Sequence, residues 1–423
     1  MDLISAFIEQ YRREFDFFDA AARLVSLQLD SALTSSGIRA MVTYRAKRPE
    51  RLEQKLRQRN TKRAYRTNQD IYDDIADFAG VRVSLYFPGS RDEVDKVVSS
   101  RFELVAEPKP FPTGATPSYS KRFSGYWATH YRLKLRESSL QEGQKRYAAA
   151  RVEVQVASVL MHAWSEVEHD LVYKPLQGTL SDEEYAILDE LNGLVLAGEI
   201  ALERLQRAGE ARVTSEGTPF ASHFELAAYL LKSAAPLLKH GAHESALGRV
   251  DALYELLRRL EMNTPEQIKP YIEILHADTE RRSISDQIVD QVVASDRSRY
   301  KLYADIRRRF DPGSRDHKRH GTSAGDTDFG TFMRLWIELE QRMREASKAQ
   351  GLEGPDVLIG RRLIERFTRL DTETRRELDR IRMMRNRVVH GELDVDRTEL
   401  ADATKALRRI LKHLDESNLP PVK

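Results

Sequence analysis

The chain has 423 residues, of which 41% are hydrophobic and 32% charged, and its 68 basic residues nearly balance 66 acidic ones. This composition is typical of a soluble, helix-rich globular protein with two or three domains, and the balanced charge means that any basic site must be local. The sequence contains no cysteine, which excludes disulfides and thiolate metal sites.

The first predicted elements are a long helix, a strand and a second helix. Residues 2–33 repeat apolar side chains at steps of three and four, which predicts one amphipathic helix. A short strand is expected over residues 40–44, and Pro49 fits the first turn of a helix that continues to about Arg59. Neither a signal-peptide pattern nor an apolar stretch of about 20 residues occurs, so a cytoplasmic protein with no membrane partner is expected.

The strands that follow cluster before residue 157. Residues 90–100 are predicted to form a helix that Ser90 and Glu93 open as a capping box, and the proline-rich residues 107–124 a surface loop. These elements predict an α+β fold with one mixed, largely antiparallel sheet flanked by helices, followed by an all-α carboxyl-terminal region. The predicted strands are 80–87, 102–106, 126–135 and 151–156.

From residue 158 onward the chain is predicted to be helical almost throughout. Four apolar side chains share one face of the first helix in this region and are expected to lie in the core: Leu160, Trp164, Val167 and Leu171. Breaks rich in Gly, Ser and Pro indicate linkers near residues 207–219 and 311–330. We therefore expect three domains, over residues 1–208, 219–310 and 326–423.

Two carboxylates are candidates for a divalent metal site. Glu153 and Gln155 alternate with valines on a predicted strand, which places both polar side chains on one face of the sheet. A carboxylate on such a face must be exposed, paired or bound to a metal, and together with Asp77 it could form a two-carboxylate Mg²⁺ site. Alternatively, Asp77 only turns the chain before the next strand.

A basic stretch and an aromatic pair could bind a nucleotide. Residues 45–66 contain ten Lys and Arg residues, which suit a polyphosphate or simply form a solvated helix face. Tyr126 and His130 share one side of a predicted strand, either as groups that stack on and hydrogen-bond a base or as members of the sheet core. The cations at the predicted junction of strand and helix are Arg45, Lys47, Arg51 and Lys55.

Taken in order, these segments resemble the synthetase domain of the RelA/SpoT alarmone synthetase family over residues 40–175. The resemblance implies a nucleotidyltransferase-like fold and a GTP pyrophosphokinase-like enzyme, a Mg²⁺-dependent transferase that moves pyrophosphate from ATP to the 3′-hydroxyl of GDP or GTP and so makes (p)ppGpp in the stringent response. The resembling segments are Tyr44-Arg45-Ala46-Lys47, Asp77-Phe78-Ala79-Gly80-Val81-Arg82, Gly125-Tyr126 with His130, and Glu153-Val154-Gln155 with Trp164, Glu168-His169 and Tyr173-Lys174.

The resemblance also implies a role for each matching residue. Asp77 would hold Mg²⁺, and Glu153 would act on the metal or on the attacking hydroxyl, so these two are the expected catalytic and metal-binding residues. The expected ATP-binding residues are Arg45, Lys47 and Lys55. The expected acceptor-binding residues are Arg122, Tyr126 and His130, with the tyrosine stacked on guanine.

Two departures from the family pattern leave the acceptor open. Ala157-Ser158 stands where the family often has Arg-Thr, and Arg51 replaces a serine. The alternative is a toxin or defence effector that pyrophosphorylates the 3′ end of a tRNA. Long family members carry a hydrolase domain before the synthetase, and about 40 residues are too few for it, so no alarmone hydrolysis is expected.

Near the carboxyl end, Arg385, Asn386 and His390 resemble the Arg-Asn-x-x-x-His motif of HEPN domains, which are helical and often ribonucleases. Asn386 and His390 are four residues apart and share a helix face. HEPN clefts form across a dimer, so a homo-oligomer is expected, and a further alternative is an RNA-binding or ribonuclease protein whose synthetase-like domain senses nucleotides. The plainer interpretation is that Arg385 and His390 stabilise a helix end before Gly391.

Overall fold

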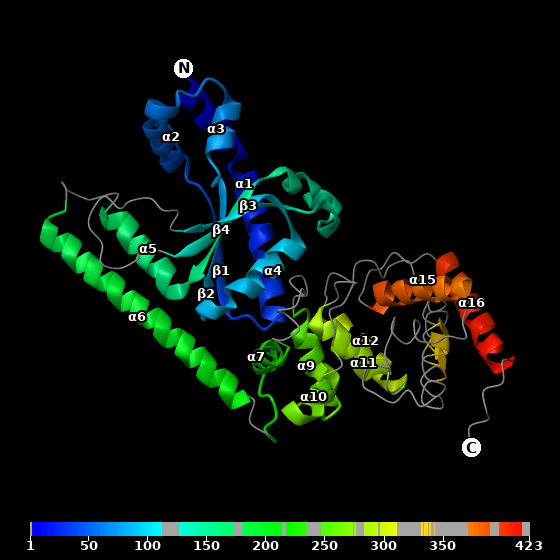
Figure 1. Ribbon diagram of the computed structural model, residues 1–423. Helices are drawn as coiled ribbons and strands as arrows, with labels where there is room; N and C mark the ends of the chain where they lie inside the picture. Colours follow the sequence, from blue (N-terminus) through cyan, green and yellow to red (C-terminus); the bar gives the residue numbers. More distant parts are fainter. Residues whose placement is uncertain are drawn as a thin grey trace. The chain divides into compact units, whose positions relative to one another are not determined.

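The computed structural model falls into two units, each described here by itself (Figure 1). The first comprises Met1–Ser215 and Ser222–Lys232, and the second comprises Glu216–Ala221 and Ser233–Lys423. The three-domain division stays a prediction. The residues that the structure describes are 2–111, 127–172, 180–213, 217–234, 247–273, 275, 283–294, 297–310, 331–332, 334–336, 338–339, 342, 371–389 and 397–416.

The first unit contains a sheet, long helices and three short 3₁₀ turns. Its strands are β1 (Ala40–Ala46), β2 (Ala79–Leu85), β3 (Phe102–Phe111), β4 (Ala128–Leu135) and β5 (Val152–Ser158). Its helices are α1 (Leu3–Ser35), α2 (Pro49–Arg63), α3 (Asn68–Asp74), α4 (Arg91–Arg101), α5 (Val159–Val172), α6 (Asp182–Val213) and α7 (His223–Ser233). The 3₁₀ turns are η1 (Pro88–Ser90), η2 (Glu137–Ser139) and η3 (Glu142–Ala149).

The five strands form one mixed sheet in the order β1-β2-β5-β4-β3. β2 and β5 run parallel, whereas the other three neighbouring pairs are antiparallel. The predicted α+β class with a largely antiparallel sheet is therefore confirmed. The last strand in the sequence, β5, lies in the centre, where Glu153 is opposite Gly80 of β2 and Gln155 is opposite His130 of β4.

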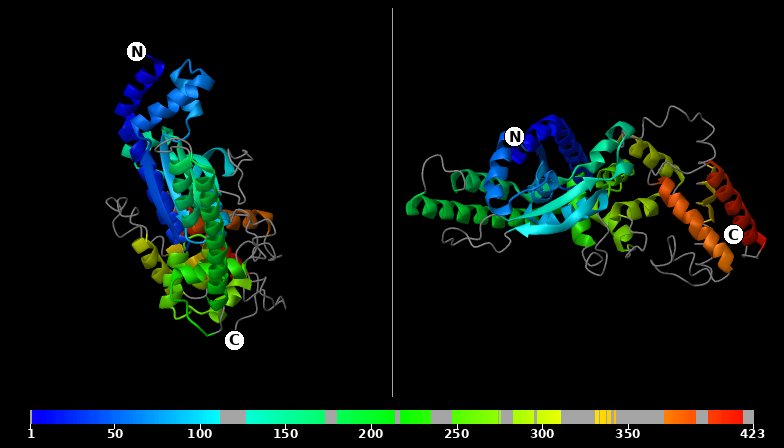
Figure 2. Two further views of the ribbon diagram at one scale, coloured as in Figure 1. Left: turned by 90° about the vertical axis from the view of Figure 1, so that its left-hand side faces the viewer. Right: turned by 90° about the horizontal axis from the view of Figure 1, so that it is seen from above.

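Helix α1 covers one face of this sheet (Figures 1 and 2). The valines that alternate with Glu153 and Gln155 point to this face, and Val154 and Val156 are buried with α1 in the main core. The predicted period-two alternation thus separates an apolar face from a polar one. Aromatic rings close the core beside the site: Tyr11 and Phe18 lie 5.6 Å and 5.4 Å, by ring centroids, from Phe78.

Helices α5 and α6 lie on the other face of the sheet, where Met161 packs with Ala128 and Ala157 (Figure 2). Trp164 is buried, as predicted for the apolar stripe of α5. The prediction is wrong for Val167 and Leu171, which are 41% and 45% exposed. Helical periodicity shows which side chains share a face, but not how far the covering element extends along that face.

The capping box lies at a different helix from the one predicted. Ser90 makes no capping hydrogen bond at α4, and Glu93 instead contacts Lys96, 2.6 Å away. Helix α3 was not predicted, and the capping box forms at its start. There Thr67 accepts from the Asp70 amide, and Asp70 accepts from the Thr67 amide. An Asp at this position accepts from the amide of the residue that caps the helix, as the expected Glu would, so the sequence signal was present in a shorter form.

The described part of the second unit is helical. Helices α9, α11 and α12 pack together through buried aliphatic side chains such as Leu253, Ile288 and Ile306. No helix within the described ranges is long and apolar enough to cross a bilayer. The helices are α9 (Val250–Arg259), α10 (Pro265–Glu273), α11 (Ile284–Ala294), α12 (Arg297–Phe310), α15 (Thr372–Val389) and α16 (Arg397–Glu416).

Candidate active site

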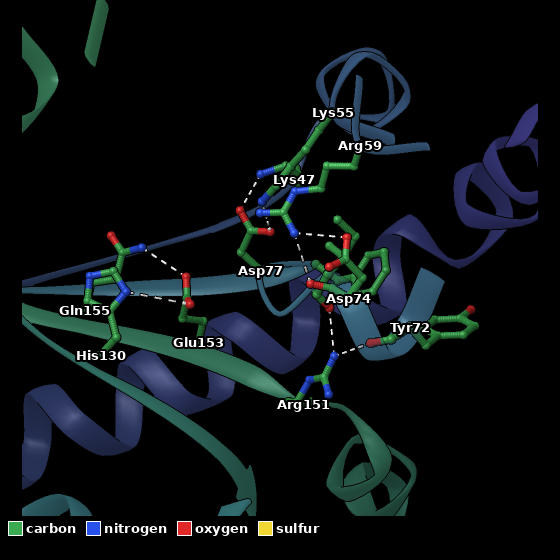
Figure 3. Close-up of polar contacts among 12 residues, drawn as sticks. Lys47, Lys55, Arg59, Tyr72, Asp74, Asp77, His130, Arg151, Glu153 and Gln155 are labelled. Atoms are coloured by element: carbon green, nitrogen blue, oxygen red, sulfur yellow. Dashed lines mark hydrogen bonds and ion pairs between the residues drawn. The ribbon is translucent and has the colours of Figure 1, made fainter. Parts of the chain in front are cut away.

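Asp77 lies in the short link between α3 and β2, and two lysines hold its carboxylate. Lys47 Nζ contacts Oδ2, and Lys55 Nζ lies 2.9 Å from Oδ1 (Figure 3). Burial opposes ionisation of Asp77, but the two ammonium charges outweigh it and lower its pKa to about 2. Asp77 is therefore a fixed negative charge, not a turn residue alone.

The backbone around Lys47 is fixed by groups of the core. Its amide donates to the carbonyl of Phe78 at 2.9 Å, and the Tyr11 hydroxyl donates to the Lys47 carbonyl at 2.7 Å. Burial lowers the pKa of Lys47, and the neighbouring Asp77 carboxylate opposes that change. The contact between Lys47 and Asp77 thus joins the end of β1 to the start of β2, next to the aromatic core.

Glu153 projects from the centre of the sheet on the face opposite α1. Gln155 Nε2 donates to Glu153 Oε2 at 3.0 Å, and His130 Nδ1 lies 3.7 Å from Oε1. Burial raises the pKa of Glu153, but these two partners outweigh it and the pKa is lowered overall. The charge of Asp77 opposes this change and raises the pKa of Glu153.

Arg151 supports the segment that carries Asp77. Its guanidinium donates to the carbonyls of Tyr72 and Ile75, the latter at 2.7 Å (Figure 3). Tyr72 belongs to α3, and Ile75 lies two residues before Asp77. Because Arg151 directly precedes β5, it connects the strand that bears Glu153 to the link that bears Asp77. Sequence reasoning missed this residue, since a lone Arg at a strand start carries no signal of its partners.

Other predicted site residues lie in different surroundings or outside the described ranges. Arg45 and Arg51 are exposed. His130 lies beside Glu153, which leaves its expected contact with an acceptor a prediction. Arg122 and Tyr126 lie outside the described residues, and their roles also stay predictions.

Two of the positions that depart from the family pattern, Ala157 and Ser158, are buried packing positions, whereas Arg51 is exposed. Ala157 is fully buried against Met161. The Ser158 hydroxyl accepts from the amide of Met161 at 3.0 Å and donates to Glu199 of α6. These two residues therefore help to fix α5 and α6 on the sheet.

Two further polar contacts on this side of the sheet were not foreseen. Arg82 of β2 pairs with Glu166 of α5, and a ring nitrogen of His162 lies 3.2 Å from the carbonyl of Val83. Arg82 shares the polar face of β2 by alternation, which was the available signal. Its partner could not be inferred, because the pairing depends on how α5 packs on the sheet.

The HEPN-like motif is only partly described. Arg385 lies in α15 with its guanidinium 2.9 Å from Asp290 of α11, and both side chains are buried. Asn386 lies in the same helix, its side chain is not described, and His390 lies outside the described residues. A ribonuclease site there stays a prediction, and the one described side chain of the motif is joined to an acidic partner.

The donor set at Asp77 and Glu153 fits a hard divalent cation. Both side chains supply carboxylate oxygens that are held ionised, and Mg²⁺ commonly takes one or two carboxylates with water and substrate phosphates completing its shell. Within the described residues there is no cluster of three or more His, Asp or Glu side chains able to hold a metal. Any such ion would therefore take its remaining ligands from water and substrate.

The fold and these contacts define an α+β domain that carries one buried carboxylate, Glu153, on a face of its mixed sheet and a second, Asp77, held by two lysines in the link before β2. Residues 44–177 match the family model of the region found in RelA / SpoT proteins, so this segment is a RelA/SpoT region, as the sequence resemblance indicated. No curated protein sequence matches the chain significantly.

Several solved structures are similar to the chain. A GTP pyrophosphokinase family protein from Streptococcus pneumoniae has 20% identity and a TM-score of 0.38, covering 49% of this chain and 95% of its own. Small alarmone synthetase 1 from Bacillus subtilis has 18% identity and a TM-score of 0.37, covering 47% and 97%. The same synthetase bound to its product pppGpp has 18% identity and a TM-score of 0.36, covering 47% and 98%.

Proposed function

We propose that the first unit transfers pyrophosphate from ATP to the 3′-hydroxyl of GDP or GTP. The observation that carries the proposal is an ionised carboxylate, Asp77, held by Lys47 and Lys55 just before β2, with a second ionised carboxylate, Glu153, on the neighbouring strand β5 of a RelA/SpoT region. Such a transfer asks the protein chiefly to position two nucleotides and to balance charge around the phosphates, and this set of side chains supplies both.

The lysines have a second use when a nucleotide is present. Lys47 and Lys55 now neutralise Asp77, and the triphosphate of ATP would offer them a competing anion. Mg²⁺, when bound, would supply positive charge to both carboxylates and phosphates. Asp77 would then exchange its ammonium partners for the ion, while Lys47 and Lys55 turn to the phosphates.

The bonds exchanged in the reaction assign a role to Glu153. The acceptor's 3′-oxygen bonds to the β-phosphorus of ATP, the bond from that phosphorus to the α,β-bridging oxygen breaks, and AMP leaves with this oxygen. Glu153 accepts the hydrogen bond of the attacking hydroxyl and takes its proton as the new bond forms. Its lowered pKa makes it a weak base, so its main contribution is to orient the hydroxyl and help hold the ion.

A tRNA 3′ end is the second candidate acceptor. It is favoured by the burial of Ala157 and Ser158, because residues that could hold acceptor phosphates at these positions in the family pattern are replaced by packing groups. A terminal ribose of RNA offers the same kind of hydroxyl without the guanine nucleotide's own 5′ phosphates. No described contact favours the ribonuclease alternative, since Arg385 is joined to Asp290.

The test is transfer of label from γ-labelled ATP by the purified full chain with GDP, GTP or deacylated tRNA as acceptor. We expect labelled guanine nucleotide and AMP, and a loss of about 100-fold or more in rate for Asp77→Asn and Glu153→Gln. The matched control is Glu142→Gln, which removes a carboxylate from the exposed turn η3 and should keep the wild-type rate.

The outcomes are distinct. If label appears on tRNA and not on the guanine nucleotide, the acceptor is the tRNA 3′ end and not GDP or GTP. The transferase proposal itself is contradicted if no acceptor becomes labelled and if mass spectrometry finds the same acceptors, unmodified, with wild type and with Glu153→Gln. A Mg²⁺ titration of the rate with and without Asp77→Asn reports separately on the cofactor.

A further inference from the structure

The cations on the two sides of Glu153 differ in their pairing. On the β2 side, Lys47 and Lys55 are both joined to Asp77. On the β4 side, Arg132 is the cross-strand neighbour of Glu153, whose described contacts are to other side chains. Within the described part of the chain, Arg132 itself has no hydrogen-bond or ion-pair partner. The lysine charges are therefore already balanced, whereas the charge of Arg132 is not.

Strand geometry places the Arg132 side chain on the polar face of the sheet. Arg132 alternates with Tyr131 and Leu133, which are buried in the core on the α1 side, and successive side chains of a strand point to opposite faces. Directly opposed residues of antiparallel strands share a face, with their Cβ atoms about 4.5–5.5 Å apart, so Arg132 and Glu153 are neighbours there. Arg132 is also partly buried, which strengthens any contact that it makes with an anion.

The row of residues across the sheet at this level leaves room beside Glu153. From β1 to β4 the row consists of Arg45, Gly80, Glu153 and Arg132. A Cβ built on Gly80 would have the Arg45 carbonyl oxygen as its nearest neighbour, 3.8 Å away. Strand β2 therefore presents no side chain next to the carboxylate, and an acceptor hydroxyl could reach Glu153 with Arg132 on its other side.

Further positive charge lies on the β3 and β4 side of the sheet. Lys109 of β3 is opposite His130 in the ladder, on the same face, and is exposed. Residues 112–126, which join β3 to β4 in the sequence, include two basic residues and no acidic one. Burial and then the charge of Arg132 are the main causes that lower the pKa of Arg151. Positive charges gathered in this way are stabilised by an anion.

The reaction proposed above needs an anion site on this side of Glu153. A nucleotide acceptor carries its reacting 3′-hydroxyl and its 5′-phosphate on one ribose, so the group that binds the phosphate must lie near the group that orients the hydroxyl. In that proposal the lysines beside Asp77 bind the donor triphosphate. Arg132 lies on the side left for the acceptor, and a guanidinium can hold phosphate oxygens through two parallel hydrogen bonds.

We propose that Arg132 binds the phosphate on the 5′ carbon of the acceptor nucleoside, with the exposed Lys109 as a second, more weakly acting cation. The inference rests on the proposed function for the reaction, and it adds a residue that determines which acceptors are taken. GDP, GTP and the terminal nucleotide of an RNA all carry a phosphate at this position, and a free nucleoside does not. Arg132 thus selects nucleotides over nucleosides.

The first test is equilibrium binding of GDP and guanosine to the purified full chain by isothermal titration calorimetry. We expect Arg132→Gln to weaken GDP binding by about 10- to 100-fold, because a charge-assisted contact with phosphate is lost, and to leave guanosine binding unchanged. Arg207→Gln is the matched control. It removes one positive charge from α6, where the Arg207 side chain is 72% exposed, and should leave both affinities unchanged.

Two further ligands separate the donor from the acceptor and one acceptor from the other. A non-hydrolysable ATP analogue should bind Arg132→Gln as it binds the wild type, and it should bind Lys55→Gln more weakly. An oligoribonucleotide that ends in CCA stands for the RNA acceptor. If the acceptor is RNA, Arg132→Gln weakens binding of this oligonucleotide, and GDP does not bind the wild-type chain.

Two more variants keep the test decisive if a neutral side chain disturbs strand β4. Arg132→Lys keeps the charge but loses the paired hydrogen bonds, so it should weaken GDP binding less than Arg132→Gln does. Lys109→Gln changes an exposed side chain of β3 and should weaken GDP binding by about 3-fold, because solvent screens its charge. The melting temperature of each variant shows whether it is folded.

The inference is overturned if Arg132→Gln leaves the affinities for GDP and for the oligonucleotide unchanged, weakens guanosine binding as much as GDP binding, or weakens only the ATP analogue. An equal effect of Arg207→Gln, or a wild-type chain that binds neither acceptor, overturns it as well.

Binding is measured without transfer, so this inference and the proposed function can fail separately. If Arg132→Gln weakens GDP binding but the wild type transfers no label, the phosphate site stands and the transferase does not. If the wild type transfers label and Arg132→Gln binds every acceptor normally, the transferase stands and the role of Arg132 does not.

Discussion

At the scale of single residues, the site is a balance between burial and charge pairing. Asp77 would resist ionisation in its buried position, and two ammonium groups reverse that tendency. Burial likewise disfavours the charged form of Lys47, whose side chain is only 18% exposed, and the carboxylate of Asp77 supplies its counter-charge. Each partner therefore makes the other's charge tolerable.

This interdependence predicts a double-mutant result. Asp77→Asn should lower the free energy of unfolding by about 1–2 kcal/mol, because Lys47 keeps a charge without its partner in a partly screened position. Adding Lys47→Met should recover part of that loss, giving a favourable coupling in a chemical-denaturation cycle. The control Glu53→Gln removes one of the two acidic partners of the exposed Arg57 and should change stability little. Additive single and double effects would contradict the coupling.

His162 predicts a pH dependence of stability. Burial is the main cause that lowers its pKa from about 6.5 to about 4, with the charge of Arg82 and His130 adding to it and contacts with the carbonyls of Val83 and Gln155 opposing it. The unfolded chain binds the proton more tightly, so stability is complete above pH 6.5 and falls as the pH decreases toward 4. The loss should be on the order of 3 kcal/mol.

The measurement is denaturant unfolding of wild type and His162→Gln between pH 4.5 and 7.5. The wild type should lose stability more steeply than the variant below pH 6.5. Identical slopes would show that His162 is not the group responsible.

Sequence reasoning at this scale identified the carboxylates but not their partners. Asp77 and Glu153 stand out because one lies just before a predicted strand and the other alternates with valines. That Lys47 and Lys55 share Asp77 depends on the angle between α2 and β1, which no local pattern specifies. The roles of Arg151 and Arg82 depend on tertiary packing in the same way.

At the scale of elements, the ends of helices are where prediction and structure differ most. The alternation predicted for β2 and β5 is confirmed, because alternating burial is a strong local signal. Strand β3, however, runs to Phe111, through residues that were expected to begin a surface loop. The parallel pairing of β2 with β5 across about 70 residues has no local signal, and it places Glu153 next to the Asp77 link. The capping signal was misread because several Ser and Thr residues precede acidic ones in this region.

The two capping candidates can be compared directly. Thr67→Ala should reduce the free energy of unfolding by about 1 kcal/mol, because it removes the acceptor for the Asp70 amide at the start of α3. Ser90→Ala is the matched control and should have little effect, since Ser90 makes no capping hydrogen bond. Chemical denaturation of both variants is the measurement, and a larger loss for Ser90→Ala would reverse the assignment.

The buried pair between α11 and α15 predicts a second coupled effect. Arg385→Met should destabilise the protein by about 3 kcal/mol or more, because it leaves Asp290 as a buried charge without this partner. The double variant Arg385→Met with Asp290→Leu should recover most of the loss in a thermal unfolding experiment. If the double variant folds but loses a ribonuclease activity that the wild type has, Arg385 is catalytic and not only structural.

At the scale of the whole molecule, the two units divide the chemistry. Asp77, Glu153 and their described partners all belong to the first unit. Helix α7 belongs to it as well and contacts α1, because a ring nitrogen of His223 lies 3.1 Å from the carbonyl oxygen of Thr34. The sequence indicated a boundary near residues 207–219 through its Gly and Pro content. It did not indicate that the chain returns to the first unit after residue 221.

This division predicts that a chain of residues 1–232 folds and keeps the transferase activity, because the sheet, its core and the candidate site need no residue beyond Lys232. The measurements are a cooperative unfolding transition and the labelled-ATP assay, each against the full chain. A folded fragment without activity would show that the second unit contributes to the reaction or to its regulation.

The central place of β5 in the sheet has a consequence for synthesis on the ribosome. The β1–β2 and β3–β4 pairs leave the ribosome first, and each has one edge that pairs with β5 in the finished sheet. Helix α1 also leaves the ribosome before the β5 valines that pack against its apolar face. Until residue 158 has left the exit tunnel, these edges and this face stay open to wrong partners. We expect nascent chains stopped before β5 to be held by chaperones, and chains stopped well after it to be released.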